Sequence, residues 1–401
     1  MDHRGSEAHA SPGATDVTDP GASIGIGLMG TAFMGRAHAR GYQGVASMYA
    51  PPSLLPRLEV VSGRDEHRRT EFAKSFGVAR TTGDWRTILD DPAVSVFDNS
   101  APNDLHEAPT IAAVQAGKHV ICEKPLGRTA DEALRIWQAA ADAGVVHMCA
   151  FNYRFVPAIR KLKELISSGA LGRPLHFRAR YLQDWLTDPG SPATWRLDAD
   201  QAGSGALGDL GSHISDLARY LVGEVDEVSG AAATFFRDRP GGAVTVDDAF
   251  VATVRFDNGA IGTLEASRVA HGHINDLSIE VNGTEGSARF SLERLNELDV
   301  DIAGADGQRG FRRLLVTDRT DPFLDAWWPP GHVLGWEHTF VHELHHFLAC
   351  VRDGRSVRPH GADFEDGYRA ALICDAILSS AATGRTEKVA PQGAVVAGAL
   401  T

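Results

Sequence analysis

The sequence predicts an α/β protein of two domains, in which a parallel sheet wrapped by helices is followed by a larger, mostly antiparallel open sheet with helices of its own. From residue 23 to about 150, short apolar runs alternate with longer helical stretches, which is typical of parallel strands joined by crossover helices. Beyond residue 170 the pattern changes to long alternating runs separated by turn residues. The length of 401 residues also exceeds that of one typical domain.

Each predicted element of the first half has a simple pattern. Two helices end at a glycine, the residue that most easily adopts the left-handed conformation found after a helix, and they are expected at 105–117 and 129–144. The apolar runs predict buried strands at 24–29, 58–62, 94–98, 119–122 and 145–149. We therefore expect a first domain over residues 23–150.

The second half carries hairpin signals. Asp257-Asn258-Gly259 stands between two alternating arms, and Asn282-Gly283 marks another turn. Two helices are expected at about 336–353 and at 364–383. These elements predict a second, α+β domain over residues 151–390, while the polar residues 1–22 are expected to be a disordered leader and residues 391–401 a tail.

Composition excludes several classes of protein. The 39 basic and 52 acidic residues give a net charge of -13, which disfavours binding to the phosphates of a nucleic acid. No run approaches the roughly 18 apolar residues of a membrane helix, and the leader lacks a signal-peptide core, so we expect a cytoplasmic protein that does not bind membranes. The four cysteines form no C-x-x-C pair, which predicts reduced, buried thiols rather than disulfides or a zinc site.

A glycine-rich turn follows the first predicted strand. In "GTAFMGRAH", Gly30 and Gly35 match the first and last glycines of G-x-G-x-x-G, while Ala32 replaces the middle one. In that motif the glycines permit a tight turn and the close approach of a pyrophosphate to the N-terminus of a helix. The motif predicts a Rossmann dinucleotide-binding domain, although any tight strand-to-helix turn gives the same pattern.

The end of the second predicted strand, Ser62-Gly63-Arg64-Asp65, bears on the choice of cofactor. A small residue followed by arginine leaves room for a 2'-phosphate and supplies a forked donor, which favours NADP. If Asp65 instead binds the ribose hydroxyls, NAD is the cofactor.

Three stretches carry a resemblance to a known family. "NSAPNDLHEAPTIAAVQA" leads into "GKHVICEKPLGRTADEA", and "GSGALGDLGSHISDLARYLVGE" follows at 203–224. Together with the glycine-rich turn they resemble the Gfo/Idh/MocA family of oxidoreductases, which includes glucose-fructose oxidoreductase and inositol dehydrogenase. The resemblance extends from Ile24 to about Val389.

The resemblance implies three catalytic residues, Lys124, Asp209 and His213. Asp209 and His213 are four residues apart and are expected to share one helix face. An imidazole has a suitable pKa to accept the proton of an alcohol near neutral pH, and a carboxylate beside it can orient it. Lys124 is expected to hydrogen-bond the reacting oxygen while a hydride passes between the alcohol carbon and the nicotinamide.

The remaining candidate residues flank these three in the sequence. The cofactor is expected to contact Gly30, Ala32, Phe33, Met34, Gly35, Ser62, Gly63, Arg64, Ser100, Ala101, Pro102, Asn103, His106, Glu123, Lys124 and Asn152. The substrate is expected to contact Lys124, Tyr153, Arg154, Asp184, Trp185, Trp195, Arg196, Asp209, His213 and His332. Aromatic faces with forked polar groups suit a sugar, although structural roles explain each of these residues equally well.

The expected function is NAD(P)-dependent hydride transfer at a secondary alcohol of a sugar, glycoside or cyclitol, with C3 of a glucose-type ring as one candidate position. Two alternatives remain open, a glycosidase that oxidises C3 transiently and a cofactor-binding regulator without catalysis. An open sheet face usually needs a partner, so a homodimer or homotetramer is expected.

One further motif points to different chemistry. "HTFVHELHHFL" contains His342-Glu343-Leu344-His345-His346, a match to the H-E-x-x-H pattern of zinc peptidases. On a helical projection, His342 and His346 lie opposite an apolar arc. The arc comprises Phe340, Val341, Leu344, Phe347, Leu348 and Val351. We therefore expect a surface helix whose two histidines face water or a domain edge, and no metal site.

Overall fold

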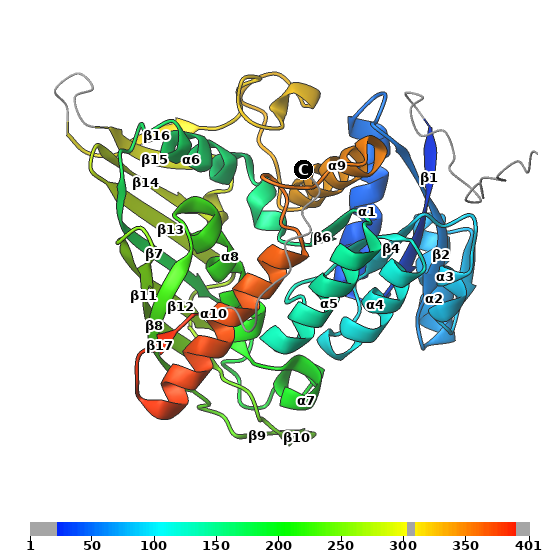
Figure 1. Cartoon of the computed structure of the whole chain (residues 1–401), viewed down its shortest axis with the longest axis horizontal. Helices are drawn as coiled ribbons and strands as arrows, with labels where there is room; N and C mark the ends of the chain where they lie inside the picture. Colours follow the sequence, from blue (N-terminus) through cyan, green and yellow to red (C-terminus); the bar gives the residue numbers. More distant parts are fainter. Residues whose placement is uncertain (1–21, 303–308, 390–401) are drawn as a thin grey trace, which may run out of the picture.

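A computed structural model of the chain describes residues 22–302 and 309–389. Two sheets divide the molecule, with helices packed between and around them (Figure 1). The predicted leader, apart from residue 22, and the predicted tail lie outside the described residues. Among the residues that the structure describes, none of the helices is long and apolar enough to cross a membrane.

The first sheet has six parallel strands in the order β3-β2-β1-β4-β5-β6. Its strands are β1 (Ser23–Met29), β2 (Leu55–Ser62), β3 (Arg80–Thr82), β4 (Val96–Asn99), β5 (His119–Cys122) and β6 (His147–Cys149). The order reverses between β1 and β4, which is the point where such sheets bind ligands at their carboxyl edge. The predicted Rossmann arrangement is confirmed.

Helices join these strands, and their ends follow capping rules. The predicted helix at 129–144 is α5 (Ala130–Ala143), where the Thr129 side chain accepts a hydrogen bond from the Glu132 N–H and Gly144 closes the helix with φ 64°. The other connecting helices are α1 (Phe33–Met48), α2 (Glu66–Phe76), α3 (Arg86–Leu89) and α4 (Glu107–Gln115).

The second sheet has nine strands in the order β16-β15-β14-β13-β7-β12-β11-β8-β17, and all its pairs are antiparallel except β12 with β7. Its strands are β7 (Pro174–Leu182), β8 (Val225–Ala233), β11 (Ala249–Phe256), β12 (Ile261–Ser267), β13 (Asp276–Gly283), β14 (Gly286–Ser291), β15 (Glu297–Ile302), β16 (Arg312–Leu315) and β17 (Glu387–Lys388). A separate short hairpin pairs β9 (Asp238–Arg239) with β10 (Gly242–Ala243).

The two predicted hairpins are present in this sheet, with one shift. Asp257-Asn258-Gly259 joins β11 to β12 as expected. Asn282 and Gly283 still belong to β13, and the turn into β14 comes two residues later, because Asn282 pairs with Ser287 and keeps the ladder intact.

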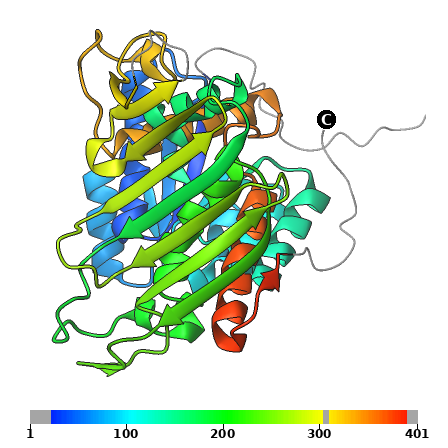
Figure 2. The ribbon, with the colours of Figure 1, turned by 90° about the vertical axis from the view of Figure 1, so that its left-hand side faces the viewer.

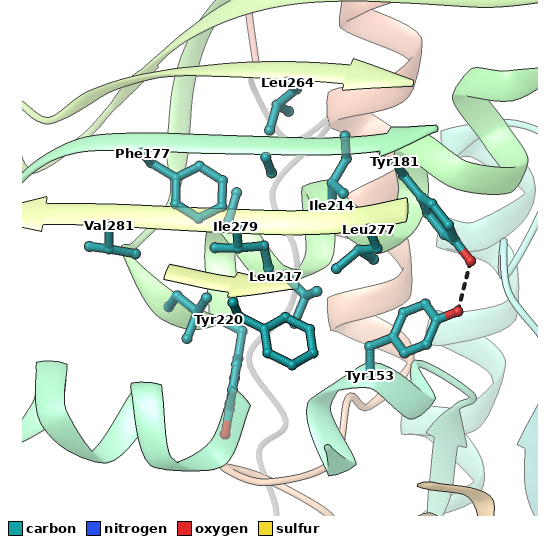
Figure 3. Packing of buried hydrophobic residues seen from close by; sticks show 14 of the residues in the cluster. Tyr153, Phe177, Tyr181, Ile214, Leu217, Tyr220, Leu264, Leu277, Ile279 and Val281 are labelled. Atoms are coloured by element: carbon teal, nitrogen blue, oxygen red, sulfur yellow. Dashed lines mark hydrogen bonds between the residues drawn. The ribbon is translucent and has the colours of Figure 1, made fainter. Parts of the chain in front are cut away.

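Helices cover only one face of the nine-stranded sheet (Figures 1 and 2). α6 (Pro157–Ser167), α8 (Ser212–Leu221) and α10 (Phe364–Thr383) pack on that face. Phe177, Leu264 and Ile279 point from the strands toward these helices in the core (Figure 3). No helix of the described residues covers the opposite face, called the bare face below, and the burial of β11 accordingly alternates between exposed and buried along the strand.

The helix that carries the H-E-x-x-H pattern is α9 (His338–Asp353), and it is not a surface helix. His342 is 0% exposed and His346 is 9% exposed, which corrects the prediction that both lie on the surface. The reason is that α9 is covered on both sides. α1 packs against the apolar arc (Figure 1), at Phe340, Val341 and Leu344, while Phe155, Phe323 and Trp327 cover the opposite side, where the histidines lie. All four cysteines are buried and free of disulfides.

Candidate functional site

The glycine-rich turn between β1 and α1 is packed too closely against the backbone to accept a side chain at either of its two motif glycines. Gly30 has φ 120°, and a Cβ atom there would lie 2.6 Å from the carbonyl oxygen of Ser100. A Cβ atom on Gly35 would lie 2.2 Å from the carbonyl oxygen of Gly30. Within the described chain the N-cap Ala32 makes no side-chain hydrogen bond to α1, so the first N–H groups of the helix are free of a side-chain cap. This arrangement fits the pyrophosphate of a dinucleotide.

A groove of about 670 Å³ opens beside this turn. The residues that line it are Thr31, Ala32, Phe33, Arg36, Arg68, Glu71, Lys74 and Ser75. Phe33 is 62% exposed and stacks on Trp336 at 5.7 Å between ring centroids. Met34 lies half-buried in the first turn of α1.

The end of β2 borders the same groove. The carbonyl oxygen of Ser62 accepts a hydrogen bond from Gly30 N at 3.0 Å, and Gly63 approaches the Thr31 side chain. Arg64 is exposed. The Asp65 carboxylate accepts a hydrogen bond from Arg68 N at 3.0 Å and so caps α2. Asp65 therefore already has a structural task, and Arg64 is the free side chain at this strand end.

The loop after β4 is held by buried polar contacts. Ser100 Oγ donates to the carbonyl oxygen of Met29 at 3.1 Å, and Asn103 Nδ2 donates to that of Ala202 at 2.9 Å. The buried His106 ring lies between the carbonyl oxygens of Pro125 (2.8 Å) and Ala101 (3.0 Å). Pro102 precedes the short 3-10 helix Asn103–Leu105. These contacts fix the loop at the carboxyl edge of the sheet, next to β5.

Lys124 follows β5 and reaches the second domain. Its Nζ donates to Asp209 Oδ1 at 2.9 Å and to the Asp209 carbonyl oxygen at 3.1 Å. The other carboxylate oxygen of Asp209 accepts from Arg268 Nη2 at 2.8 Å. Burial opposes ionisation of Asp209, but the charges of Lys124 and Arg268 outweigh it and hold its pKa well below the usual range. Asp209 is therefore an anion clamped between two cations.

His213 lies beside this pair inside an aromatic enclosure. Its ring centroid is 4.6 Å from that of Tyr153 and 5.9 Å from those of Phe151 and Tyr181. Burial, reinforced by the positive charge of Lys124, holds the pKa of His213 well below its usual range. Among the described residues its Nδ1 atom is buried and has no hydrogen-bond partner. The imidazole is therefore neutral and can accept a proton.

Asp209 and His213 do not share an ordinary α-helix. Leu207–Gly211 forms a π-helical segment that runs directly into α8, where His213 is the second residue. Such segments are rare and occur often at functional sites. Asp247 fixes the N-terminal start of this segment, because its carboxylate accepts hydrogen bonds from Gly205 N (2.7 Å) and Leu207 N (2.8 Å).

A chain of polar side chains leads away from His213. Tyr153 and Tyr181 share a hydrogen bond of 2.7 Å between their hydroxyls (Figure 3), and the Tyr181 hydroxyl also donates to Asn275 Oδ1 at 2.9 Å. Gln183 Nε2 donates to the same Asn275 oxygen at 2.6 Å. Trp185 Nε1 in turn donates to Gln183 Oε1 at 2.8 Å.

Two further candidates lie on the Arg268 side of Asp209. The guanidinium of Arg196 stacks on the Trp195 ring at 4.5 Å, and burial lowers its pKa while the nearby Asp209 opposes that shift. Arg268 lies 5.4 Å from the Trp185 ring and donates to the Arg196 carbonyl oxygen at 3.3 Å. Asp184, beside Trp185, is half-buried, and its carbonyl oxygen accepts from Thr187 Oγ1 at 2.7 Å.

Three predicted site residues are engaged elsewhere. Arg154 is buried and pairs with Asp216 (2.6 Å) and Asp366 (3.2 Å). Asn152 Nδ2 donates to Thr339 Oγ1 at 2.9 Å. His332 lies on an exposed loop, where its Nδ1 is 2.7 Å from the Pro329 carbonyl oxygen. The structure does not bring these three to the Lys124–Asp209 pair.

Arg268 was not predicted from the sequence, although a signal for it exists. In "IGTLEASRV" the inward positions of β12 are Gly262, Leu264 and Ala266, and Arg268 continues the same phase. An arginine at an inward position must find an anion, since a buried guanidinium without a partner is costly. The side chain is 1% exposed and its anion is Asp209.

The α9 histidines do not form a metal site. Trp327 Nε1 can only donate, so its 2.8 Å hydrogen bond makes His342 Nε2 the acceptor, while His342 Nδ1 donates to the Phe155 carbonyl oxygen at 3.0 Å. His346 Nε2 donates to the Val357 carbonyl oxygen at 2.8 Å. Within residues 22–302 and 309–389, no group of three or more His, Cys, Asp or Glu side chains is placed to hold a metal ion.

The glycine-rich turn lies at the point where the strand order reverses, and Lys124 reaches from that edge of the sheet to a half-buried aspartate beside a neutral histidine. Together these features define a nicotinamide-dependent oxidoreductase. Residues 24–151 match the oxidoreductase family with the NAD-binding Rossmann fold, and residues 159–289 match the GFO/IDH/MocA C-terminal domain. The chain belongs to the Gfo/Idh/MocA family of oxidoreductases.

Several relatives cover nearly the whole chain. Levoglucosan dehydrogenase of Pseudarthrobacter phenanthrenivorans is 43% identical over 90% of this chain and 96% of its own length. Myo-inositol 2-dehydrogenase of Thermotoga maritima is 30% identical over 91% of this chain and 98% of its own. A solved structure of levoglucosan dehydrogenase in complex with NADH and levoglucosan superposes with a TM-score of 0.89, at 44% identity, over 92% of this chain and 99% of that one.

Proposed function

We propose that the protein oxidises a secondary alcohol of a sugar or anhydrosugar, with Lys124, Asp209 and His213 as its catalytic residues. The observation that carries this proposal is the half-buried Lys124–Asp209 pair beside the neutral His213. The likeness to a levoglucosan dehydrogenase over 90% of the chain supports a glucose-type ring. The nicotinamide, when bound, takes up the hydride.

The three side chains divide the remaining work. His213 receives the hydroxyl proton of the substrate, and its low pKa ensures that it is unprotonated before the reaction. Lys124 hydrogen-bonds the reacting oxygen and stabilises the negative charge that develops there. Asp209 holds Lys124 in position, and Arg268 holds Asp209 from its other oxygen.

Substrate contacts are proposed on both sides of this centre. Tyr153 lies on the His213 side, and Trp185, Trp195 and Arg196 lie on the Arg268 side. Aromatic faces can pack on the C–H faces of a sugar ring while a guanidinium binds its hydroxyls.

We propose that the chain binds NAD(H) and that Arg64 also accommodates the 2'-phosphate of NADP(H). Arg64 is exposed at the end of β2, and Asp65 is occupied in capping α2. The NADH complexes of levoglucosan dehydrogenase support NAD, and the arginine supports NADP.

We further propose that the bare face of the nine-stranded sheet pairs with a second copy of the chain, to form a dimer or tetramer. Val251 and Ile261 expose about half of their side chains there, at 52% and 49%. Light scattering should give a multiple of 42.9 kDa, and Ile261→Asp should lower it. A monomer at micromolar concentration would contradict this proposal.

The test of the catalytic proposal is a panel of sugars, anhydrosugars, glycosides and inositols, assayed with NAD and NADP for the reduced nicotinamide. A keto sugar should accumulate together with the reduced cofactor. Cleavage of a glycoside without net change in the cofactor would show instead a glycosidase that oxidises its substrate transiently.

Lys124→Met should lower kcat by about 100-fold or more, because one group that stabilises the transition state is lost. The binding of NADH, measured by fluorescence, should persist. Lys118→Met is the matched control, since Lys118 donates only to the carbonyl oxygens of Asp91 and Val94. Full activity of Lys124→Met would contradict the assignment.

A further inference from the structure

A buried cluster of charged groups lies directly behind Lys124. The His38 ring, from α1, has Asp98 Oδ2 2.8 Å from its Nδ1 atom and Glu123 Oε1 3.0 Å from its Nε2 atom. His38 and Asp98 are 0% exposed, and Glu123 is 3% exposed. Nothing in the hydride-transfer chemistry above uses His38, so its place between two carboxylates requires another explanation.

The cluster connects to the active site through Glu123. Its second oxygen, Oε2, accepts a hydrogen bond from the backbone N–H of Lys124 at 3.1 Å. One carboxylate thus binds both His38 and the main chain of the lysine whose Nζ is 2.9 Å from Asp209. On the far side of His38, Asp98 also accepts from the Tyr42 hydroxyl at 3.0 Å, and that contact does not lead to Lys124.

We propose that His38 is a positioning residue for Lys124, which holds the Glu123 carboxylate in the orientation that fixes the lysine's main chain. The inference rests on the proposed catalytic role of Lys124. Glu123 is placed by two donors, His38 Nε2 and Lys124 N, and the loss of the first leaves the carboxylate free to turn away from the second.

The charges around His38 are consistent with this role. Burial opposes protonation of His38, but Asp98 and Glu123 outweigh it and hold its pKa well above the usual value. Both ring nitrogens can then donate, one to each carboxylate. From α9, the glutamate of the H-E-x-x-H pattern, Glu343, also acts on this cluster, and burial raises its pKa well above the usual value. A protonated Glu343 adds no third negative charge to the cluster.

Two substitutions of His38 distinguish a role in positioning Lys124 from a role in the stability of the fold. The amide nitrogen of asparagine overlays Nδ1 of histidine, and that of glutamine overlays Nε2. His38→Gln therefore keeps the donor to Glu123, whereas His38→Asn keeps the donor to Asp98. Both remove the ring and its charge, so a purely structural role predicts similar effects of the two on turnover.

The expected results are a kcat at least about tenfold lower in His38→Asn and within about threefold of wild type in His38→Gln, because a small displacement of a catalytic group is costly. The Kd of NADH should stay within about twofold in both. Tyr42→Phe is the control, since it should lower the melting temperature without lowering kcat. Equal loss of kcat in the two His38 variants would overturn the proposal.

Two further measurements keep the inference testable. Glu123→Ala removes the hydrogen-bond partner of both His38 Nε2 and Lys124 N, and an unchanged kcat in this variant would contradict the proposal even if the His38 variants do not fold. Crystal structures of the His38 variants test the proposal without measuring turnover. The hydrogen bond between Lys124 Nζ and Asp209 should be kept in His38→Gln and lost in His38→Asn. If the crystal structures agree and no sugar is oxidised, the proposed function fails and the positioning role stands.

Discussion

Arg64 is exposed at the end of β2, where we propose that it meets the 2'-phosphate of a bound NADP. Arg64→Ala should raise KM for NADP about tenfold or more and leave KM for NAD nearly unchanged, because a charge-assisted hydrogen bond to phosphate is worth roughly 1.5–3 kcal/mol. Steady-state kinetics with both cofactors measure this. Arg57→Ala on the same strand, where Arg57 pairs with Glu59 at 3.2 Å, is the control. Equal losses with both cofactors would exclude the role.

Single residues also show how far the sequence alone can lead. Lys124, Asp209 and His213 could be selected because their motifs resemble a family, yet the sequence does not show that Asp209 is clamped by Arg268, a residue 59 positions away in the chain. Arg154 was expected to bind substrate, but the structure pairs it with Asp216 and Asp366. Its neighbourhood in sequence does not reveal which carboxylates the fold brings to it.

At the scale of elements, local sequence patterns predict that a helix or strand exists, and where it ends, better than they predict which other elements surround it. The helices predicted at 129–144 and 364–383 agree with α5 and α10 to within a residue, and in the structure Thr129 and Asp363 accept hydrogen bonds from the first turns of these helices. The burial of α9 was mispredicted because a helical projection shows which side is apolar and not which elements cover the other side. The π-helical segment at Leu207–Gly211 was also missed, because tertiary contacts such as those of Asp247 stabilise it.

The buried α9 histidine His342 makes a prediction about acid stability. Burial lowers its pKa to about 3, while the unfolded chain has a value near 6.5. Between these values the unfolded state binds one more proton than the folded state, so this histidine's contribution to stability is present above pH 6.5 and is lost as the pH falls.

His342→Asn should therefore reduce the slope of unfolding free energy against pH by roughly 1.4 kcal/mol per pH unit between about pH 6 and 4. Asparagine keeps a donor for the Phe155 carbonyl oxygen and loses the acceptor for Trp327, so the variant should also be less stable at pH 7. Urea denaturation at several pH values measures both effects. His67→Asn controls for the removal of an exposed imidazole, and an unchanged slope in His342→Asn would refute the prediction.

At the scale of the whole molecule, the two sheets are tied together by the last two helices. α9 follows all strands of the second sheet except β17 in the sequence but packs on α1, and α10 packs on both α5 and β8 (Figure 1). Cys149 N, at the edge of the first sheet, donates to the Ala362 carbonyl oxygen at 2.9 Å. The division into domains at 23–150 and 151–390 remains a prediction, and these contacts indicate that the two do not unfold independently.

Calorimetry should accordingly show one unfolding transition, and NADH should shift all of it. A ligand at about 100 times its Kd stabilises the folded state by roughly 2.7 kcal/mol. If the molecule unfolds cooperatively, this stabilisation applies to both sheets, even though the glycine-rich turn at Gly30 belongs to the first. Lys124→Met should show a similar shift, because we propose that the lysine acts mainly on turnover. Two transitions of which NADH moves only one would mean that α9 and α10 do not couple the sheets, and that the domains are independent folding units.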